Sequence, residues 1–250
     1  NLIMVPSGKN ETMTFGSAVH WALNKLFRSL PDNGNVFHGI GQFLSDFEWY
    51  MKRNREAFTD EQFKRRMEYG EKILPEFYNK YVDTWEKITV TEYAIKQVEV
   101  DGVPIKGVLD KLEFRGSQAN VVDYKTGNYE RAKAKFAAPN EKDPLGGDYW
   151  RQAVFYKILV ESDRRKNWEV VSTEFDFVEP VKEEYVKHKV VIEPEHIAVV
   201  KGQIKDSYQR ILNHEFTGCG KEDCNWCGFV RSNFKKEVDL VQGVEEEEER

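Results

Sequence analysis

Two acidic residues and a lysine follow apolar stretches in the middle of the sequence. Asp110 comes after Val108-Leu109, and Asp123 and Lys125 come after Val121-Val122. Alternate residues of a strand point to one face, so Asp123 and Lys125 share a face, and hairpin pairing can bring Asp110 to it. Two carboxylates beside an ammonium group suit Mg²⁺ or Mn²⁺, which can bind a phosphate oxygen and lower the pKa of bound water. Phosphodiester hydrolysis needs these parts.

Three further residues are candidates for the same site. His20 follows a glycine near the start of an amphipathic pattern, where it is a candidate metal ligand. Gln152 and Tyr156 are four residues apart and therefore face one side of a helix, from which they can orient Lys125 or a nucleic-acid backbone. We expect three nearby glutamates to face solvent: Glu92, Glu99 and Glu113.

The first third of the chain is predicted to be helical. Apolar residues recur at helical spacing over residues 13–30 and 37–51, and Thr59 with Gln62 has the spacing of a capping box for a helix towards residue 81. Pro75 should kink or divide that third helix.

The rest of the chain is predicted to alternate strands and helices. A meander over residues 85–100, 103–114 and 120–125 contains the hairpin signal Asp101-Gly102, and a loop follows over residues 127–147. Helices are expected at 149–160 and 194–212, and strands at 169–178 and 185–192. These patterns indicate one α/β domain over residues 1–236, with a cysteine-rich segment at 219–227 and an acidic tail at 237–250.

Composition and charge narrow the class of protein. The 250 residues include 40% hydrophobic and 32% charged ones, without an apolar run long enough for a membrane span or a secretory signal. The net charge of −6 equals that of the tail, so the remaining residues are formally neutral. Local basic clusters and exposed aromatic residues such as Trp150 are therefore expected to grip and stack on DNA. The basic clusters are Lys52/Arg53/Arg55, Lys64/Arg65/Arg66, Arg131/Lys133/Lys135 and Arg164/Arg165/Lys166.

Four motifs in this order resemble the RecB-type branch of the PD-(D/E)XK nuclease superfamily. They are Gly16-x-x-x-His20, Asp110, Asp123-Tyr124-Lys125 and Gln152-x-x-x-Tyr156. The resemblance implies an α/β, restriction-endonuclease-like fold, with a mixed central sheet flanked by helices after the helical N-terminal third. It also implies Mg²⁺ held by His20, Asp110, Asp123 and the Tyr124 backbone carbonyl, with catalysis by Asp110, Asp123, Lys125, Gln152 and Tyr156. The expected products carry a 5′-phosphate and a 3′-hydroxyl.

The three cysteines lie close together near the C-terminus. Cys219, Cys224 and Cys227 have C-x4-C-x2-C spacing, but zinc and iron–sulfur sites normally take four protein ligands. Some RecB-type nucleases bind a [4Fe-4S] cluster through three C-terminal cysteines and a fourth before the histidine helix, which this sequence lacks. Three alternatives stay open: a [4Fe-4S] cluster, Zn²⁺ with His214 as fourth ligand, or free thiols.

The C-terminal sequence and the residues around Gln152 look most like the nuclease module fused behind a UvrD-type helicase. We therefore predict a DNA exonuclease of repair or recombination, in the cytoplasm, with a helicase portion of the same polypeptide as a partner. Since the family usually has another segment before the histidine helix, the natural chain is expected to extend further. The alternatives are a catalytically silent DNA-binding module and a zinc-binding adaptor.

Overall fold

The described part of the protein comprises two compact units. The computed structural model describes residues 10–215 and, beyond them, residues 218, 219, 222, 224, 227–229 and 232. One unit ends at Gln203 and the other begins at Ile204. The predicted acidic tail lies outside the described residues, and the single domain over residues 1–236 stays a prediction.

Three helices form the N-terminal part of the first unit: α1 (Glu11–Arg28), α2 (Ile40–Arg53) and α3 (Asp60–Tyr81). Their apolar faces meet in one core, where Phe15, Phe47 and Phe77 are almost completely buried. The Thr59 hydroxyl accepts from the Gln62 amide and the Gln62 side chain accepts from the Thr59 amide, so the predicted capping box is confirmed.

Pro75 does not divide the third helix, so that part of the prediction is wrong. α3 continues through Pro75 to Tyr81. Leu74 and Phe77 on either side of the proline are buried in the helical core. Burial of such side chains contributes about 1.5–3 kcal/mol each, which offsets the hydrogen bond that proline removes.

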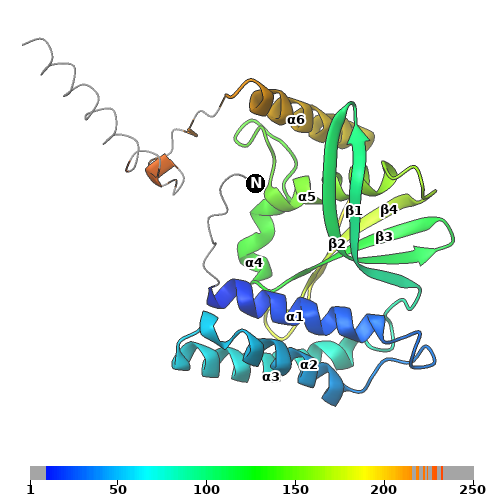
Figure 1. The fold of residues 1–250 in the computed structure, drawn as a ribbon, viewed down its shortest axis with the longest axis vertical. Coiled ribbons are helices and arrows are strands. Elements are labelled where there is room, and N and C mark those ends of the chain that lie inside the picture. The colour runs from blue at the N-terminus through cyan, green and yellow to red at the C-terminus, as the bar shows by residue number, and fades with distance from the viewer. Residues whose placement is uncertain are drawn as a thin grey trace, which may run out of the picture. The chain divides into compact units, whose positions relative to one another are not determined.

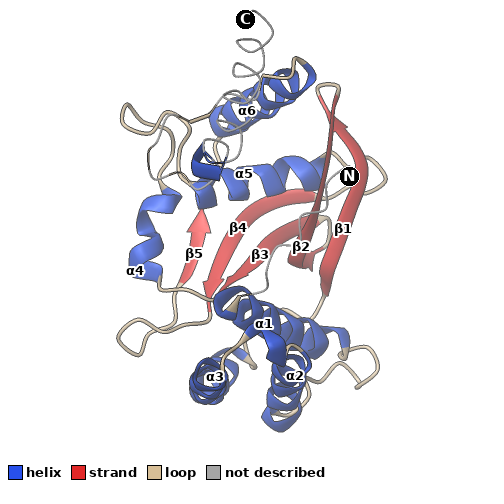
Figure 2. Ribbon diagram, turned by 60° about the vertical axis from the view of Figure 1, so that its left-hand side comes forward, coloured by secondary structure: helices blue, strands red, loops and turns tan. Residues whose placement is uncertain are grey.

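A five-stranded mixed sheet follows the helices. Its strands are β1 (Thr89–Val100), β2 (Val103–Arg115), β3 (Gln118–Lys125), β4 (Glu169–Phe177) and β5 (Lys187–Val190), and they lie side by side in sequence order. Figure 2 shows this sheet, in which only β3 and β4 are parallel. Asp101 and Gly102 join β1 to β2, with φ of 50° and 81°, which is the left-handed turn that the Asp-Gly pair predicts.

The parallel pair is connected by a helical crossover. The segment contains α4 (Tyr129–Ala132), a 3₁₀ turn at Lys133–Phe136 and α5 (Asp148–Glu161). The prediction of an unstructured loop over residues 127–147 is therefore wrong in its first half, where Asn128 caps α4 by accepting from the Arg131 amide. The last long helix, α6, spans Pro194–Leu212 as predicted.

The sheet is covered on both faces (Figure 1). Val121 of β3 packs with α5, whereas its neighbours Val122 and Tyr124 pack into the core of α1–α3. Side-chain alternation along β3 therefore sends Asp123 and Lys125 to the α5 face. The predicted fold class, a mixed sheet flanked by helices after a helical N-terminal third, is confirmed. No helix in the described ranges has the length and apolar character that a membrane crossing requires.

Candidate active site

Three carboxylates form a row across neighbouring strands. The registry between β2 and β3 pairs Lys111 with Val122, and its continuation brings Asp110 opposite Asp123. On the other side of β2, Glu92 of β1 lies between the residues paired with Lys111 and with Leu109, which places it opposite Asp110. The predicted meeting of Asp110 and Asp123 thus follows from the registry of the meander.

Asp123 is the most deeply buried of these carboxylates, and a compact set of donors surrounds it. The side chain is only 3% exposed, and its Oδ2 lies 2.7 Å from Lys125 Nζ. Its Oδ1 accepts hydrogen bonds from Tyr156 Oη at 2.8 Å and from Gln152 Nε2 at 3.0 Å. Lys125 Nζ in turn donates to Gln152 Oε1 at 2.9 Å. The Gln152 amide group therefore connects the Lys125 ammonium group to the Asp123 carboxylate. Gln152 and Tyr156 are both held in position by α5.

His20 is positioned by α1 at the end of β3. Its Nε2 donates to the Tyr124 carbonyl at 2.9 Å, and its Nδ1 lies 3.3 Å from Asp110 Oδ1. Asp110 Oδ2 accepts from the Tyr124 amide at 2.9 Å. A side chain at Gly16, one turn before His20, would approach Thr126 Oγ1 to 2.9 Å, so the glycine permits this close approach of helix and strand.

The electrostatics of the site reflect burial and the pairing of charges. Burial raises the pKa of Asp123, and the Asp110 charge adds to this, while Lys125 and Tyr156 act in the opposite direction. Burial tends to lower the pKa of His20, but the adjacent Asp110 raises it above its ordinary value overall. Asp110 therefore favours the charged form of His20, and burial opposes it.

The ligand set fits a hard divalent cation. Ligand atoms of His20, Glu92 and Asp110 lie within 4.8 Å of one another. A pocket of about 410 Å³ is lined by His20, Asp110, Asp123 and Tyr124. Carboxylate and carbonyl oxygens with one imidazole suit Mg²⁺ or Mn²⁺, and an imidazole nitrogen binds a metal ion in its unprotonated form.

The three glutamates expected in solvent differ from one another. Glu99 and Glu92 are exposed, yet Glu92 belongs to the row of carboxylates and has a φ of 49°, which is uncommon for a non-glycine residue. Glu113 is the exception to the prediction, because its side chain is only 13% exposed and lies 2.9 Å from the completely buried Lys111. Glu92 could have been identified from strand alternation together with the β1–β2 registry, because only one registry places it opposite Asp110.

Trp150 does not have the exposed position that was predicted. Its indole is 1% exposed and packs edge-on against the His196 ring at a centroid distance of 5.3 Å. Trp150 is therefore a buried residue of α5, and the prediction that it stacks on DNA bases is wrong.

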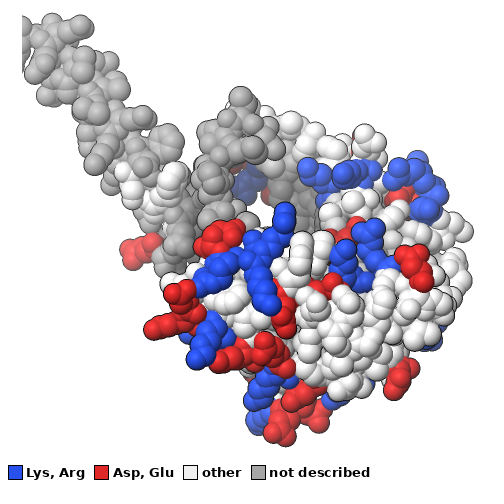
Figure 3. Space-filling model, turned by 60° about the horizontal axis from the view of Figure 1, so that its bottom comes forward, with Lys and Arg blue, Asp and Glu red and all other residues white. Residues whose placement is uncertain are grey.

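Most of the predicted basic clusters are paired with acids. Arg65 and Arg66 both contact Glu11, and Lys52 contacts Glu48 at 2.7 Å. Figure 3 shows one face of the molecule, on which Lys and Arg side chains are interspersed with Asp and Glu. Charge alone therefore does not mark a DNA-binding surface on this face.

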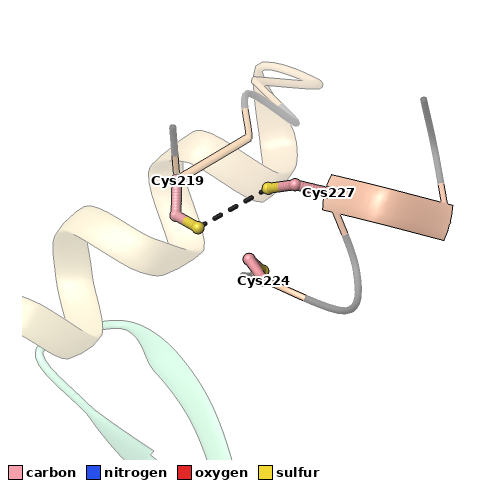
Figure 4. A group of neighbouring side chains, drawn as sticks. All are labelled: Cys219, Cys224 and Cys227. Atoms are coloured by element: carbon pink, nitrogen blue, oxygen red, sulfur yellow. Dashed lines mark hydrogen bonds between the residues drawn. The ribbon is translucent and has the colours of Figure 1, made fainter. Parts of the chain in front are cut away.

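The three cysteines of the second unit lie close together in space. Their sulfur atoms lie within 4.8 Å of one another, and Cys219 Sγ is 3.5 Å from Cys227 Sγ (Figure 4). Among the described residues, this metal-compatible group consists of the thiols alone and does not include His214.

Comparison with known proteins shows the family. A model of the PD-(D/E)XK nuclease superfamily matches residues 4–232, so the chain belongs to this superfamily. Its members are phosphodiester hydrolases that generally use divalent metals. The superfamily part of the resemblance is thereby confirmed, while the RecB-type branch and the link to a UvrD-type helicase stay predictions.

Solved structures resemble the chain at low sequence identity. A "Putative exonuclease" from Eubacterium rectale is 17% identical, with a TM-score of 0.48 over 92% of this chain and 76% of that chain. The structure of SSO0001 is 11% identical, with a TM-score of 0.33 over 84% of this chain and 80% of that chain. No curated protein matches the sequence.

Proposed function

We propose that the chain is a Mg²⁺-dependent DNA exonuclease that acts in repair or recombination as the nuclease part of a helicase-nuclease. The observation that carries this proposal is the contact of Asp123 with Lys125, opposite Asp110 on the neighbouring strand. Superfamily membership supports the hydrolysis of phosphodiester bonds. DNA as the substrate, the exonuclease mode and the helicase rest on the resemblance of the sequence motifs.

The residues of the row are suited to hold the metal ion. His20, Asp110, Asp123 and the Tyr124 carbonyl would bind it, and the Glu92 carboxylate is near enough to assist. When bound, the ion supplies a positive charge for a phosphate oxygen and lowers the pKa of a coordinated water.

Lys125 is the residue best placed to act on the reacting groups. Lys125 lines the same pocket, and its side chain is 18% exposed. From there it can position the attacking water and offset the negative charge that develops on the phosphate. Gln152 and Tyr156 hold Lys125 and Asp123 in place, which makes them positioning residues in this proposal.

The test is digestion of end-labelled single- and double-stranded DNA with Mg²⁺ by the wild type and by Lys125→Ala. We expect the variant to lose about 100-fold or more in kcat, because general acid-base and electrostatic contributions of one group have that size. EDTA should abolish cleavage by the wild type. The fate of the label reports whether cleavage starts at an end and from which one.

Lys72→Ala serves as the matched control, because Lys72 is an exposed lysine of α3 that does not line the pocket. Equal cleavage by the wild type and Lys125→Ala would contradict the assigned role of Lys125. DNA binding without cleavage by either protein would instead support the catalytically silent module.

The gathered thiols favour a second proposal for the C-terminal unit, namely a structural metal bound by Cys219, Cys224 and Cys227. Three thiolates suit Zn²⁺ or an iron–sulfur cluster, each with one ligand from outside this group. Elemental analysis of the purified chain tests this proposal: stoichiometric zinc or iron supports it, and absence of both from anaerobically purified protein contradicts it.

A further inference from the structure

Two tryptophans and a tyrosine form an aromatic surface on α1 and α2. The rings of Trp21 and Trp49 are stacked, with centroids 5.4 Å apart and planes inclined by 20°. Tyr50 contacts the Trp21 ring at a centroid distance of 5.8 Å. Although it is a large apolar residue, Trp49 is 48% exposed. These three residues are called the tryptophan platform below.

Cationic side chains accompany both indole rings. Lys25 Nζ lies 4.8 Å from the Trp21 ring centroid, and the Arg53 guanidinium lies 5.4 Å from that of Trp49. Both cations are exposed. The surface thus offers aromatic area next to positive charge, which is the combination that binds bases and the adjoining phosphates of a nucleic-acid strand.

The platform borders the candidate active site through two of its three residues, Trp21 and Tyr50. An open groove of about 640 Å³ is lined by Trp21 and Tyr50 together with His20, Glu92 and Asp110. Grooves of this volume accept ligands of the size of one or more nucleotides. Trp21 and His20 line the same groove, so a base on the Trp21 side of the platform would belong to a nucleotide close to the phosphate that reacts.

We propose that the tryptophan platform binds unpaired bases of a single DNA strand and guides that strand to the carboxylate row. The inference rests on the proposed nuclease function and adds to it the class of substrate. Bases within a duplex already stack on their neighbours and expose only their edges in the grooves, so a flat aromatic surface selects unpaired bases. The exposed Arg53 side chain can leave the Trp49 ring when a base stacks there, and it can then lie against that base.

The experiment compares the affinity of the protein for an oligo-dT strand with that for a strand of equal length and charge that lacks bases. Affinities are measured in EDTA, so that no cleavage occurs, for the wild type, Trp49→Ala, Trp49→Phe and Ile88→Ala. Ile88 is an exposed apolar control outside the platform and is 69% exposed. Melting curves and circular dichroism establish that each variant is folded.

We expect Trp49→Ala to lose about 10-fold in affinity for oligo-dT, since one base–aromatic stack contributes that much, and to bind the abasic strand as before. Trp49→Phe should retain most of the affinity, and Ile88→Ala all of it. In cleavage assays Trp49→Ala should raise KM for single-stranded DNA and leave kcat nearly unchanged. Equal affinity of the wild type for the two strands, or an unchanged affinity of Trp49→Ala, would overturn the inference.

The two proposals can fail separately. Mg²⁺-dependent cleavage with an unaltered Trp49→Ala variant would keep the nuclease and remove the role of the platform. Base-dependent binding that needs Trp49, without cleavage under any metal condition, would keep the platform and remove the nuclease. Preference for a blunt duplex over the single strand would also overturn the platform inference.

Discussion

At the scale of single residues, the site depends on the groups that offset the burial of one carboxylate. Asp123 loses most of its hydration, which raises its pKa, and it is compensated by an ammonium group and two hydrogen-bond donors. These partners favour the charged form of the carboxylate, which is the form that binds a metal ion. The residues that hold Asp123 are therefore as necessary as those that touch the substrate.

Tyr156→Phe tests this dependence. The change removes the hydroxyl that donates to Asp123 Oδ1, so the pKa of Asp123 should rise further. Activity should fall by about 10-fold, as expected for one lost hydrogen bond to a charged group, and its acid limb should move to higher pH. The pH dependence of kcat/KM measures both effects.

Tyr149→Phe is the matched control, because Tyr149 belongs to the same helix and its ring lies 4.6 Å from Lys125 Nζ. Among the described residues, the side chains that contact the Asp123 carboxylate are Lys125, Gln152 and Tyr156. A pH profile of Tyr156→Phe that coincides with that of the wild type would show that the hydroxyl does not influence Asp123.

At the scale of elements, the strands fix Asp110 and Asp123, whereas the helices supply the remaining groups. The position of α5 is tightly constrained, because its N-cap is Gly147, where any side chain would collide with the backbone carbonyl of Lys135. The glycine thus determines how closely the crossover approaches the helix that carries Gln152 and Tyr156.

We expect Gly147→Ala to destabilise the protein by about 1–3 kcal/mol, as overpacking against backbone does, and to lower kcat through displacement of Gln152. Urea unfolding and cleavage kinetics measure the two effects. Gly39→Ala is a close control: Gly39 also caps a helix without a side-chain bond, its φ of −62° is similar to the −72° of Gly147, and nothing lies within 4 Å of an added Cβ. Equal stability of the two variants would refute this account of Gly147.

The elements also show what could be predicted from the sequence. Amphipathic periodicity and strand alternation are local properties, so α1, the β1–β3 meander and the shared face of Asp110 and Asp123 were predictable. Contacts between distant elements leave no such local pattern. The stacking of Trp21 on Trp49, the burial of Trp150 and the pairing of Glu113 with Lys111 depend on how helices and strands pack together, and they were missed.

At the scale of the whole molecule, charge is buried on the sheet face opposite the site. Asp176 is completely buried, and its carboxylate lies 2.6 Å from Lys187 Nζ. Burial raises the pKa of Asp176 to about 7, even though Lys187 acts against the shift. The folded protein therefore binds a proton here over a pH range in which the unfolded chain, with an ordinary pKa of 3.8, does not.

Because the folded state holds the extra proton, Asp176 lowers the stability of the protein as the pH rises from about 4 to about 7. Asp176→Asn lacks this proton equilibrium, so its free energy of unfolding relative to the wild type should increase over the same range, by about 4 kcal/mol at most. Urea unfolding at several pH values provides the measurement.

Asp163→Asn provides a control of opposite sign. Hydrogen bonds from Arg165 lower the pKa of Asp163, so its charged form stabilises the fold, and this variant should lose stability relative to the wild type as the pH rises from the acid range. A constant difference between Asp176→Asn and the wild type at all pH values would contradict the assigned pKa.

The residues of the candidate site come from segments that are far apart in the sequence. This separation affects the order in which they come together during folding. Asp110 and Asp123 come from adjacent antiparallel strands joined by a tight turn, and such local pairings form early. His20 comes from a much earlier segment, and Tyr156 from a helix beyond the meander, so both join only when distant parts of the chain dock. A nascent or partly unfolded chain thus carries its acidic pair without the groups that make the pair reactive. We therefore expect the complete site to assemble only with the tertiary contacts between distant segments of the chain.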